Sequence, residues 1–132
     1  MSTPVSYDAG VAHQIGHYAD AVRVPAGYDQ IVVSGTPGLA DNGTVSADMT
    51  GQATQAWRNV EKILAQAGAA LSDIVLVRQW LIKPSDLPAY VAVRSKVLSH
   101  EPAFMLGVIP GLIRPDILVE IEVVAAVPSQ GA

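Results

Sequence analysis

The stretch Leu118-Val119-Glu120-Ile121-Glu122-Val123-Val124, residues 118–124, decides the fold of this chain. Apolar and acidic residues alternate along it, which is typical of a β-strand with one buried face. The alternation places Glu120 and Glu122 on one face of the strand and the three intervening apolar side chains on the other. The stretch therefore predicts a sheet with one face packed on a core and a second face that carries polar groups.

The rest of the chain supplies the other strands of that sheet. Runs rich in Val, Ile and Leu, bounded by turn residues, predict strands at residues 18–24, 30–34, 73–82 and 103–108, and residues 117–124 form the last strand. Two predicted helices separate these strands, in the order strand, strand, helix, strand, helix, strand, strand. This order predicts an α+β fold, a mixed sheet with two helices on one face.

Each helix has a recognisable beginning. The first is predicted to start between residues 46 and 50, with Ser46 or Asp48 as the N-cap, and to end before Gly68. The second is predicted to start at a Ser85 cap and to end near residue 100. One apolar stripe of this second helix contains Leu87, Val91 and Leu98.

Composition indicates a single domain that associates with copies of itself. The chain has 132 residues, of which 50% are hydrophobic and 15% are charged. A compact monomer of this mass exposes roughly 6,600 Å². With so many apolar residues in a chain of this size, part of that surface is expected to be apolar. We therefore expect one domain over residues 1–132, with loosely ordered ends at 1–13 and 128–132, and apolar surface buried between subunits.

The same composition excludes several classes of function. No cysteine is present, so thiolate metal sites and thiol nucleophiles are excluded, and a reducing, cytoplasmic location is compatible with the chain. The net charge of −4, with scattered basic residues, argues against nucleic-acid binding. No apolar run is long enough to span a membrane. His13 and His17 have helical ligand spacing but no further ligand motif, so ordinary loop histidines are favoured over a metal site.

Two interpretations of the acidic face remain open. Glu120 and Glu122 are a candidate acid/base pair whose pKa burial raises, or they are the solvated polar face of a half-buried strand. Ser34 lacks the context of a serine-hydrolase nucleophile, and Gly35-Thr36-Pro37-Gly38 lacks the lysine of a phosphate-binding loop. From the residues alone, the function stays open.

Short motifs follow one another in a specific order: Gly16-His17-Tyr18, Ile31-Val32-Val33-Ser34-Gly35, Gln52-Ala53, Asn59-Val60, Ala67-Gly68, Asp73-Ile74-Val75, Glu101-Pro102-Ala103, Val119-Glu120-Ile121-Glu122 and Ala125. In this order and spacing, from about residue 14 to residue 127, the chain resembles the Rid family (YjgF/RutC-like, L-PSP-type proteins). The resemblance implies a chorismate-mutase-like domain that forms a homotrimer, with a central β-barrel and ligand clefts between neighbouring subunits. It also implies hydrolysis of reactive enamines and imines, such as 2-aminoacrylate, without a metal or an organic cofactor.

The resemblance assigns roles to individual positions. It places a cleft-lining tyrosine at Tyr18, a serine at Ser34 and a water-activating glutamate at Glu120. The backbone at Ser34 and Gly35 is a candidate binding site for an oxyanion. The family arginine that grips the substrate carboxylate falls on Phe104, which has no charge. Ordinary 2-aminoacrylate deaminase activity is therefore not expected.

Three further cleft positions depart from the family pattern. A family asparagine falls on Val91, a tyrosine on Arg94 and a small or polar residue on Leu106. These changes predict a more apolar ligand. Arg94 or Arg114 is a candidate replacement for the missing charge, and both also suit a solvated surface. The alternative to an enzyme of altered specificity is a non-catalytic metabolite-binding trimer, and a nuclease is disfavoured by the acidic balance.

Overall fold

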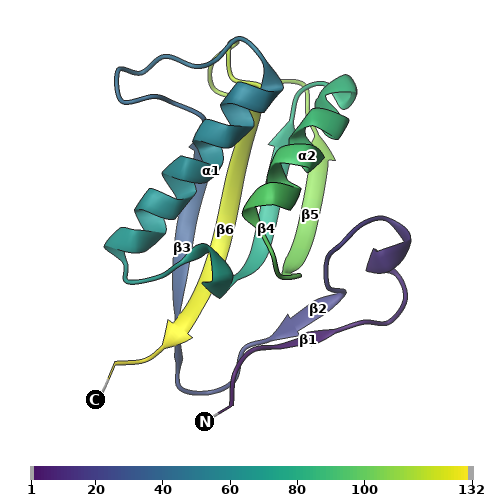
Figure 1. Cartoon of the computed structure of the whole chain (residues 1–132), viewed down its shortest axis with the longest axis vertical. Coiled ribbons are helices and arrows are strands. Elements are labelled where there is room, and N and C mark those ends of the chain that lie inside the picture. Colours follow the sequence, from purple (N-terminus) through teal and green to yellow (C-terminus); the bar gives the residue numbers. More distant parts are fainter. Residues whose placement is uncertain (1, 131–132) are drawn as a thin grey trace.

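A computed structural model describes residues 2–130 of the chain and shows one sheet layer beneath two helices (Figure 1). The sheet contains β3 (Tyr28–Pro37), β6 (Val119–Pro128), β4 (Ile74–Leu81) and β5 (Ala103–Val108), in that spatial order. β6 pairs antiparallel with both β3 and β4, whereas β4 and β5 are parallel. The predicted mixed sheet is confirmed, and β5 has the predicted bounds.

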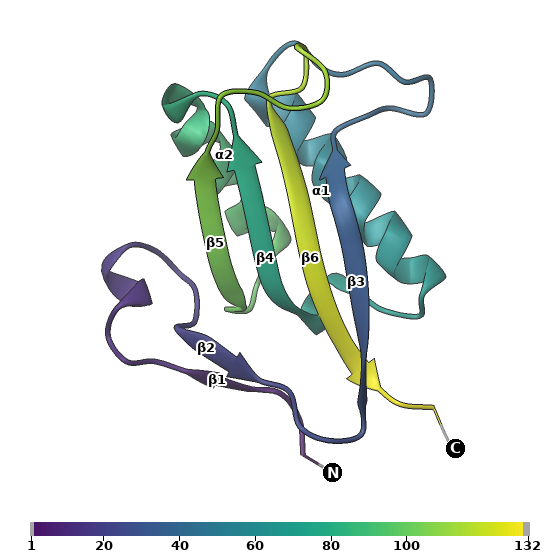
Figure 2. The same ribbon diagram turned by 180° about the vertical axis from the view of Figure 1, so that it is seen from behind.

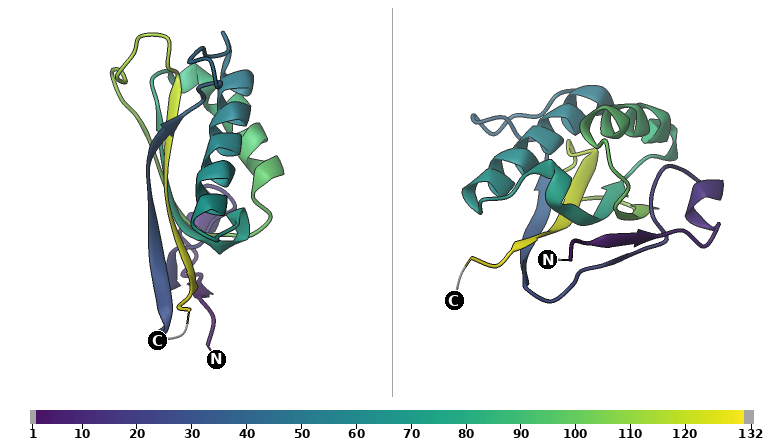
Figure 3. Two further views of the ribbon diagram at one scale, coloured as in Figure 1. Left: turned by 90° about the vertical axis from the view of Figure 1, so that its left-hand side faces the viewer. Right: turned by 60° about the horizontal axis from the view of Figure 1, so that its bottom comes forward.

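Both helices lie on the same face of the sheet, as the side view in Figure 3 makes clear. α1 (Met49–Gln66) begins after Asp48, whose side chain accepts a hydrogen bond of 2.8 Å from the Gly51 backbone N–H. Gly68 follows the helix with a φ of 76°, a left-handed conformation that glycine adopts without strain. The predicted N-cap and stop signal of this helix are therefore confirmed.

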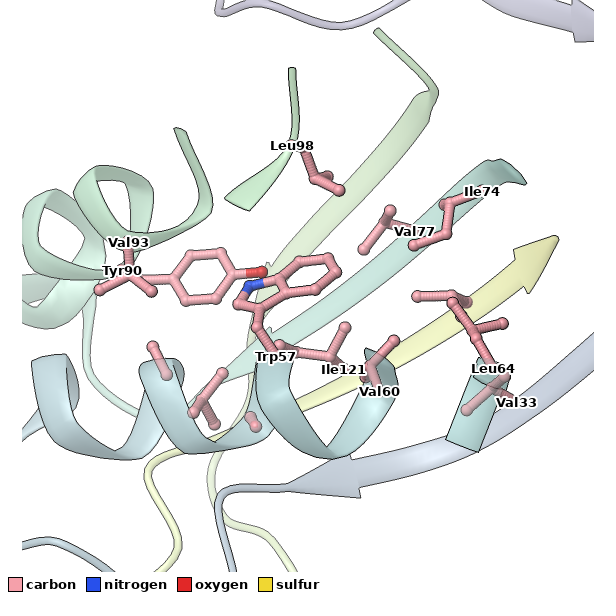
Figure 4. Close-up of a cluster of buried hydrophobic side chains, with 14 of the residues drawn as sticks. Val33, Trp57, Val60, Leu64, Ile74, Val77, Tyr90, Val93, Leu98 and Ile121 are labelled. Carbon is pink, nitrogen blue, oxygen red and sulfur yellow. The ribbon is translucent and has the colours of Figure 1, made fainter. Parts of the chain in front are cut away.

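The core lies between these helices and the sheet (Figure 4). Trp57 and Val60 of α1 are almost fully buried, and they pack with Val77 of β4 and Ile121 of β6. Tyr90 of α2 (Leu87–Val97) points its ring at the Trp57 indole. This single core anchors both helices to the centre of the sheet.

The second face of the sheet carries no helix (Figure 2). Val32 on β3 is 75% exposed and Met105 on β5 is 54% exposed. The chain as a whole exposes 7530 Å², against roughly 6,600 Å² for a compact monomer of its mass. The predicted uncovered face is therefore present, and it is partly apolar.

An N-terminal hairpin lies beside the sheet edge formed by β5. β1 (Val5–Tyr7) pairs with β2 (Ala21–Arg23), and a loop with a short 3-10 turn at Ala12–Gln14 joins them. No element was predicted for β1. The predicted strand at 18–24 is shortened to β2 and pairs with β1 in a separate two-stranded sheet, so its predicted place in the main sheet is wrong. The reason is the Asp20 carboxylate, which accepts hydrogen bonds from the backbone N–H groups of Ala9, Val11 and Ala12 and so holds the loop folded. Residues 1 and 131–132, in the ends predicted to be loosely ordered, lie outside the described part of the chain.

The second helix differs from its prediction at both ends. A 3-10 turn at Pro84–Asp86 precedes it, so the predicted Ser85 cap is wrong. Proline at the first position of that turn fixes the backbone and favours this entry. The helix ends at Val97 rather than near residue 100. Its buried residues are Tyr90 and Val93. Of the predicted apolar stripe, Leu98 is buried in the core and Val91 packs against it, whereas Leu87 is 38% exposed.

Candidate functional site

A pocket of about 520 Å³ lies at the edge of the sheet, between α2, β5 and the loop that carries residues 15–18. Five predicted site residues line it together: Tyr18, Val91, Arg94, Phe104 and Leu106. They come from three separate elements, so only the fold brings them together. The remaining lining residues, which the sequence analysis did not single out for the site, are Ile15, Gly16, His17, Leu87, Ser95 and Met105.

Aromatic and cationic side chains stack inside this pocket. The rings of Tyr18 and Phe104 are 5.3 Å apart at an interplanar angle of 26°. The guanidinium carbon of Arg94 lies 4.3 Å from the centre of the Phe104 ring and 5.7 Å from that of Tyr90. Cation–π attraction of this kind contributes about 0.5–2 kcal/mol. The residue at position 104 therefore serves as a platform for the arginine at position 94.

A buried amide anchors that arginine. Gln79 on β4 is fully buried, and its Oε1 accepts hydrogen bonds from Arg94 Nη1 at 2.7 Å and from the Tyr90 hydroxyl at 2.8 Å. Its Nε2 donates to the Met105 carbonyl at 2.9 Å. The sequence analysis missed Gln79. The available signal was a polar residue in the buried register of β4, between Val77 and Leu81, where an apolar side chain is expected.

The open face of the sheet carries the other predicted residues. Ser34 and Gly35 lie on β3, beside Glu120 on β6. A Cβ added at Gly35 would lie 2.7 Å from Glu120 Oε2, so a larger residue here would displace the carboxylate. Burial, and secondarily the charge of Glu122, raises the pKa of Glu120 above its ordinary value. Glu120 is thus the perturbed carboxyl of this strand, whereas Glu122 accepts a hydrogen bond from the Trp80 indole.

Within one chain, the two groups of residues do not meet. Phe104 pairs in register with the buried Val77, so it lies on the helix side of the sheet, whereas Glu120 lies on the open side. Arg114 joins neither group: its Nη2 contacts Asp116 Oδ2 at 2.6 Å and its Nη1 donates to the Gly43 carbonyl at 3.1 Å. Of the two candidate replacement arginines, only Arg94 lines the pocket.

The two loop histidines have carboxylates as neighbours. His13 Nε2 lies 3.0 Å from Glu101 Oε1, and His13 Nδ1 lies 3.1 Å from Asp8 Oδ2. The hydrogen bond to Glu101 and the charge of Asp8 raise the pKa of His13. His17 is almost fully exposed, with Nδ1 at 3.9 Å from Glu101. Among residues 2–130, no cluster of three or more His, Asp or Glu side chains is arranged to hold a metal ion.

These features define an α+β domain with an aromatic, cation-bearing pocket at a sheet edge and a perturbed carboxyl on the open sheet face. Residues 11–127 match the family model described as endoribonuclease L-PSP. The chain belongs to this family, which includes the YjgF, RutC and Rid proteins. In the part of the chain that the structure describes, no helix has the length and apolarity needed to cross a bilayer.

Three similar proteins illustrate the relationship. The 3-aminoacrylate deaminase RutC of Acinetobacter baylyi is 33% identical over 130 residues, covering 96% of this chain and all of that protein. A RutC family protein of Pyrococcus abyssi is 27% identical, covering 95% of this chain and 98% of that protein. The crystal structure of the Rid protein YyfB from Yersinia pestis, of unknown function, superposes with a TM-score of 0.81 at 22% identity, covering 96% of this chain and 100% of that chain.

Proposed function

We propose that this protein is a hydrolase of small imines or enamines that works in a cleft between the subunits of a homotrimer. In this proposal, one subunit contributes the pocket that contains Tyr18, Arg94 and Phe104. Its neighbour contributes Ser34, Gly35 and Glu120 from the open face of its sheet. The proposal includes a cytoplasmic location, with which the absence of cysteine is compatible.

One observation carries the proposal: the candidate residues fall into two groups on opposite sides of the sheet. Phe104 packs on the helix side in register with Val77, and Glu120 lies on the open side, so neither group alone combines a ligand pocket with an acid/base. Association through the partly apolar open face would bury Val32 and Met105. The Acinetobacter baylyi relative is named a 3-aminoacrylate deaminase, which supports the proposed class of reaction.

The proposed chemistry follows from Glu120, a carboxyl of raised pKa that lies beside Gly35 on the open face. The ionised Glu120 takes a proton from water as the water oxygen bonds to the imine carbon and the imine nitrogen takes up a proton. The protonated carboxyl then gives its proton to the nitrogen as the C–N bond breaks. The carbinolamine hydroxyl releases its proton to water as the carbonyl forms, which offsets the proton that the imine nitrogen took from water. One imine and one water therefore give one carbonyl compound and one ammonia. An enamine enters the same sequence after a proton adds to its β-carbon.

The test is acceleration of imine hydrolysis over the spontaneous rate. An amino-acid lyase generates 2-aminoacrylate in situ, and an amino-acid oxidase generates the 2-imino acids of bulkier amino acids. The release of ammonia is then followed. We expect acceleration by the wild type and a loss of about 10²–10⁴-fold in Glu120→Gln, the range for a removed general acid/base. Glu61→Gln, on the exposed surface of α1, is the matched control and should retain the wild-type rate.

Three results would contradict the proposal or one of its parts. If no imine in the panel is hydrolysed faster than in buffer, the protein is not an imine hydrolase and the non-catalytic metabolite-binding trimer takes its place. If Glu120→Gln and Glu61→Gln turn over imine equally, Glu120 has no catalytic role. Sedimentation of the protein at the mass of a single chain would overturn the intersubunit cleft.

A further inference from the structure

Arg94 is a partly buried cation without an anionic partner. The other basic side chains near carboxylates form ion pairs: Lys62 with Asp41, Arg78 with Glu122, and Arg114 with Asp116. No Asp or Glu in the described residues pairs with Arg94. Burial is the largest cause of the shift in its pKa, which is lowered from the ordinary value. A charge withdrawn from water without a counter-charge is costly. An anionic ligand beside Arg94 would therefore offset this cost.

The hydrogen bonds of Arg94 lead to the same conclusion. A guanidinium has five N–H donors, and the only acceptor that a described residue gives Arg94 is Gln79 Oε1, at 2.7 Å. An amide fixes the direction of the side chain but does not neutralise its charge. Because the guanidinium carbon lies 4.3 Å from the centre of the Phe104 ring, one flat face is covered by an aromatic ring. Donors along the edge of a stacked guanidinium stay available for the two oxygens of a carboxylate.

The surrounding pocket fits an anion that also carries an apolar group. No Asp or Glu is among the residues that line it. Val91 and Leu106 are in its wall beside Phe104, and Ile15 and Leu87 are large apolar residues exposed at 80% and 38%. Such a wall favours a ligand with an aliphatic or aromatic substituent, because each buried methylene adds about 0.8 kcal/mol of hydrophobic stabilisation.

We infer that Arg94 is the carboxylate-binding group of this pocket, and that the ligand is a small carboxylic acid with a bulky apolar substituent. Under the proposed function, on which this assignment of the substrate rests, that ligand is the 2-imino acid of a branched or aromatic amino acid. Arg94 reaches the carboxylate from α2, and Gln79 holds it over Phe104. The small 2-aminoacrylate would leave the apolar wall unfilled.

Binding without turnover tests this inference directly. The probes are 4-methyl-2-oxopentanoate, its methyl ester and pyruvate, titrated calorimetrically into the assembled wild-type protein, Arg94→Met and Arg58→Met. We expect Arg94→Met to bind 4-methyl-2-oxopentanoate about 10- to 100-fold more weakly, the range for a lost charged hydrogen bond. We also expect the ester and pyruvate to bind the wild type at least tenfold more weakly. Arg58, exposed on α1, is the matched control.

The outcomes separate this inference from the proposed function. Unchanged binding of 4-methyl-2-oxopentanoate in Arg94→Met overturns the inference, even if imines are hydrolysed. Equal binding of the acid and its ester, or of the acid and pyruvate, overturns it as well. Arg94-dependent binding in a protein that hydrolyses no imine would sustain the inference and overturn the proposed function.

Discussion

Placing an arginine at position 104, where the family resemblance implies one, should destabilise this particular protein. The ring of Phe104 lies 4.3 Å from the guanidinium carbon of Arg94. Two unit charges at that separation repel by about 4 kcal/mol at an effective dielectric constant near 20 and by about 1 kcal/mol in water. The variant also loses the cation–π contact, about 0.5–2 kcal/mol, and the stacking on Tyr18, about 0.5–1.5 kcal/mol. The Phe104→Arg variant should therefore lose at least about 2 kcal/mol.

Thermal unfolding by circular dichroism at one fixed protein concentration measures this loss. For a chain of this size, about 2 kcal/mol corresponds to a decrease in Tm of roughly 5 °C or more. Phe104→Met is the control, since it removes the ring without adding charge. Adding Arg94→Met to Phe104→Arg should recover part of the loss, because the repelling partner is gone.

The result that would refute this reasoning is equally definite. If Phe104→Arg unfolds at or above the Tm of Phe104→Met, the charge added at position 104 is not repelled by Arg94. If the double variant shows additive losses, no repulsion joins positions 94 and 104. Either result would remove the argument that Arg94 occupies the place of the family arginine.

Three further predictions concern the open face and the loop. Gly35→Ala should lower turnover at least several-fold, because the added Cβ displaces the flexible end of the Glu120 side chain. It should change the free energy of unfolding by less than about 1 kcal/mol, because no backbone is displaced. Steady-state kinetics and thermal unfolding measure these two effects. The acid limb of the pH–rate profile should lie above the ordinary pKa of a glutamate, because burial raises the pKa of Glu120, and it should move to lower pH in Glu122→Gln, which removes the second cause. His13 has a raised pKa beside Glu101, so its stabilisation of the loop is fully present at low pH and is lost as the pH rises through the raised value; amide exchange across residues 9–17 should then quicken beyond the intrinsic pH effect.

The first of these predictions has a control variant, and each of the three has an outcome that would contradict it. Gly111→Ala, at a position where an added Cβ meets nothing within 4 Å, should leave turnover unchanged. Equal turnover in Gly35→Ala and the wild type would show that Glu120 has room to spare. A pH profile that Glu122→Gln does not shift would remove the coupling between the two carboxyls. If amide exchange across residues 9–17 keeps its excess pH dependence in His13→Asn, a group other than His13 causes that dependence.

The sequence predicted best where burial follows a local period. The alternation of residues 118–124 correctly placed Glu120 and Glu122 opposite the core, because successive side chains of a strand point to opposite faces whatever the neighbouring strands are. The strand at residues 103–108 and the cap at Asp48 also depend on local chemistry, and both were predicted correctly.

The missed features depend on contacts between distant parts of the chain. β1 has only three residues, and its pairing with β2 is accompanied by the Asp20 carboxylate, which folds the loop between them. The buried residues Tyr90 and Val93 of α2 were not predicted, because this helix covers the edge of the sheet, where Tyr90 enters the core and Leu87 faces a pocket. No periodicity within α2 shows which stripe meets the sheet.

The candidate site illustrates the same limit and also its use. The family resemblance, considered one position at a time, implies only that Phe104 lacks the charge of an expected arginine. The fold adds that Arg94 approaches the same place from α2, lies over the Phe104 ring and is tied to the buried Gln79. A phenylalanine is then the residue expected at position 104, since an aromatic ring supports a guanidinium that a second arginine would repel. In this chain the positive charge of the pocket comes from Arg94 on the helix, and Phe104 and Leu106 on the strand make the nearby wall apolar. Under the proposed function, such a pocket favours a bulkier 2-imino acid over 2-aminoacrylate as the substrate.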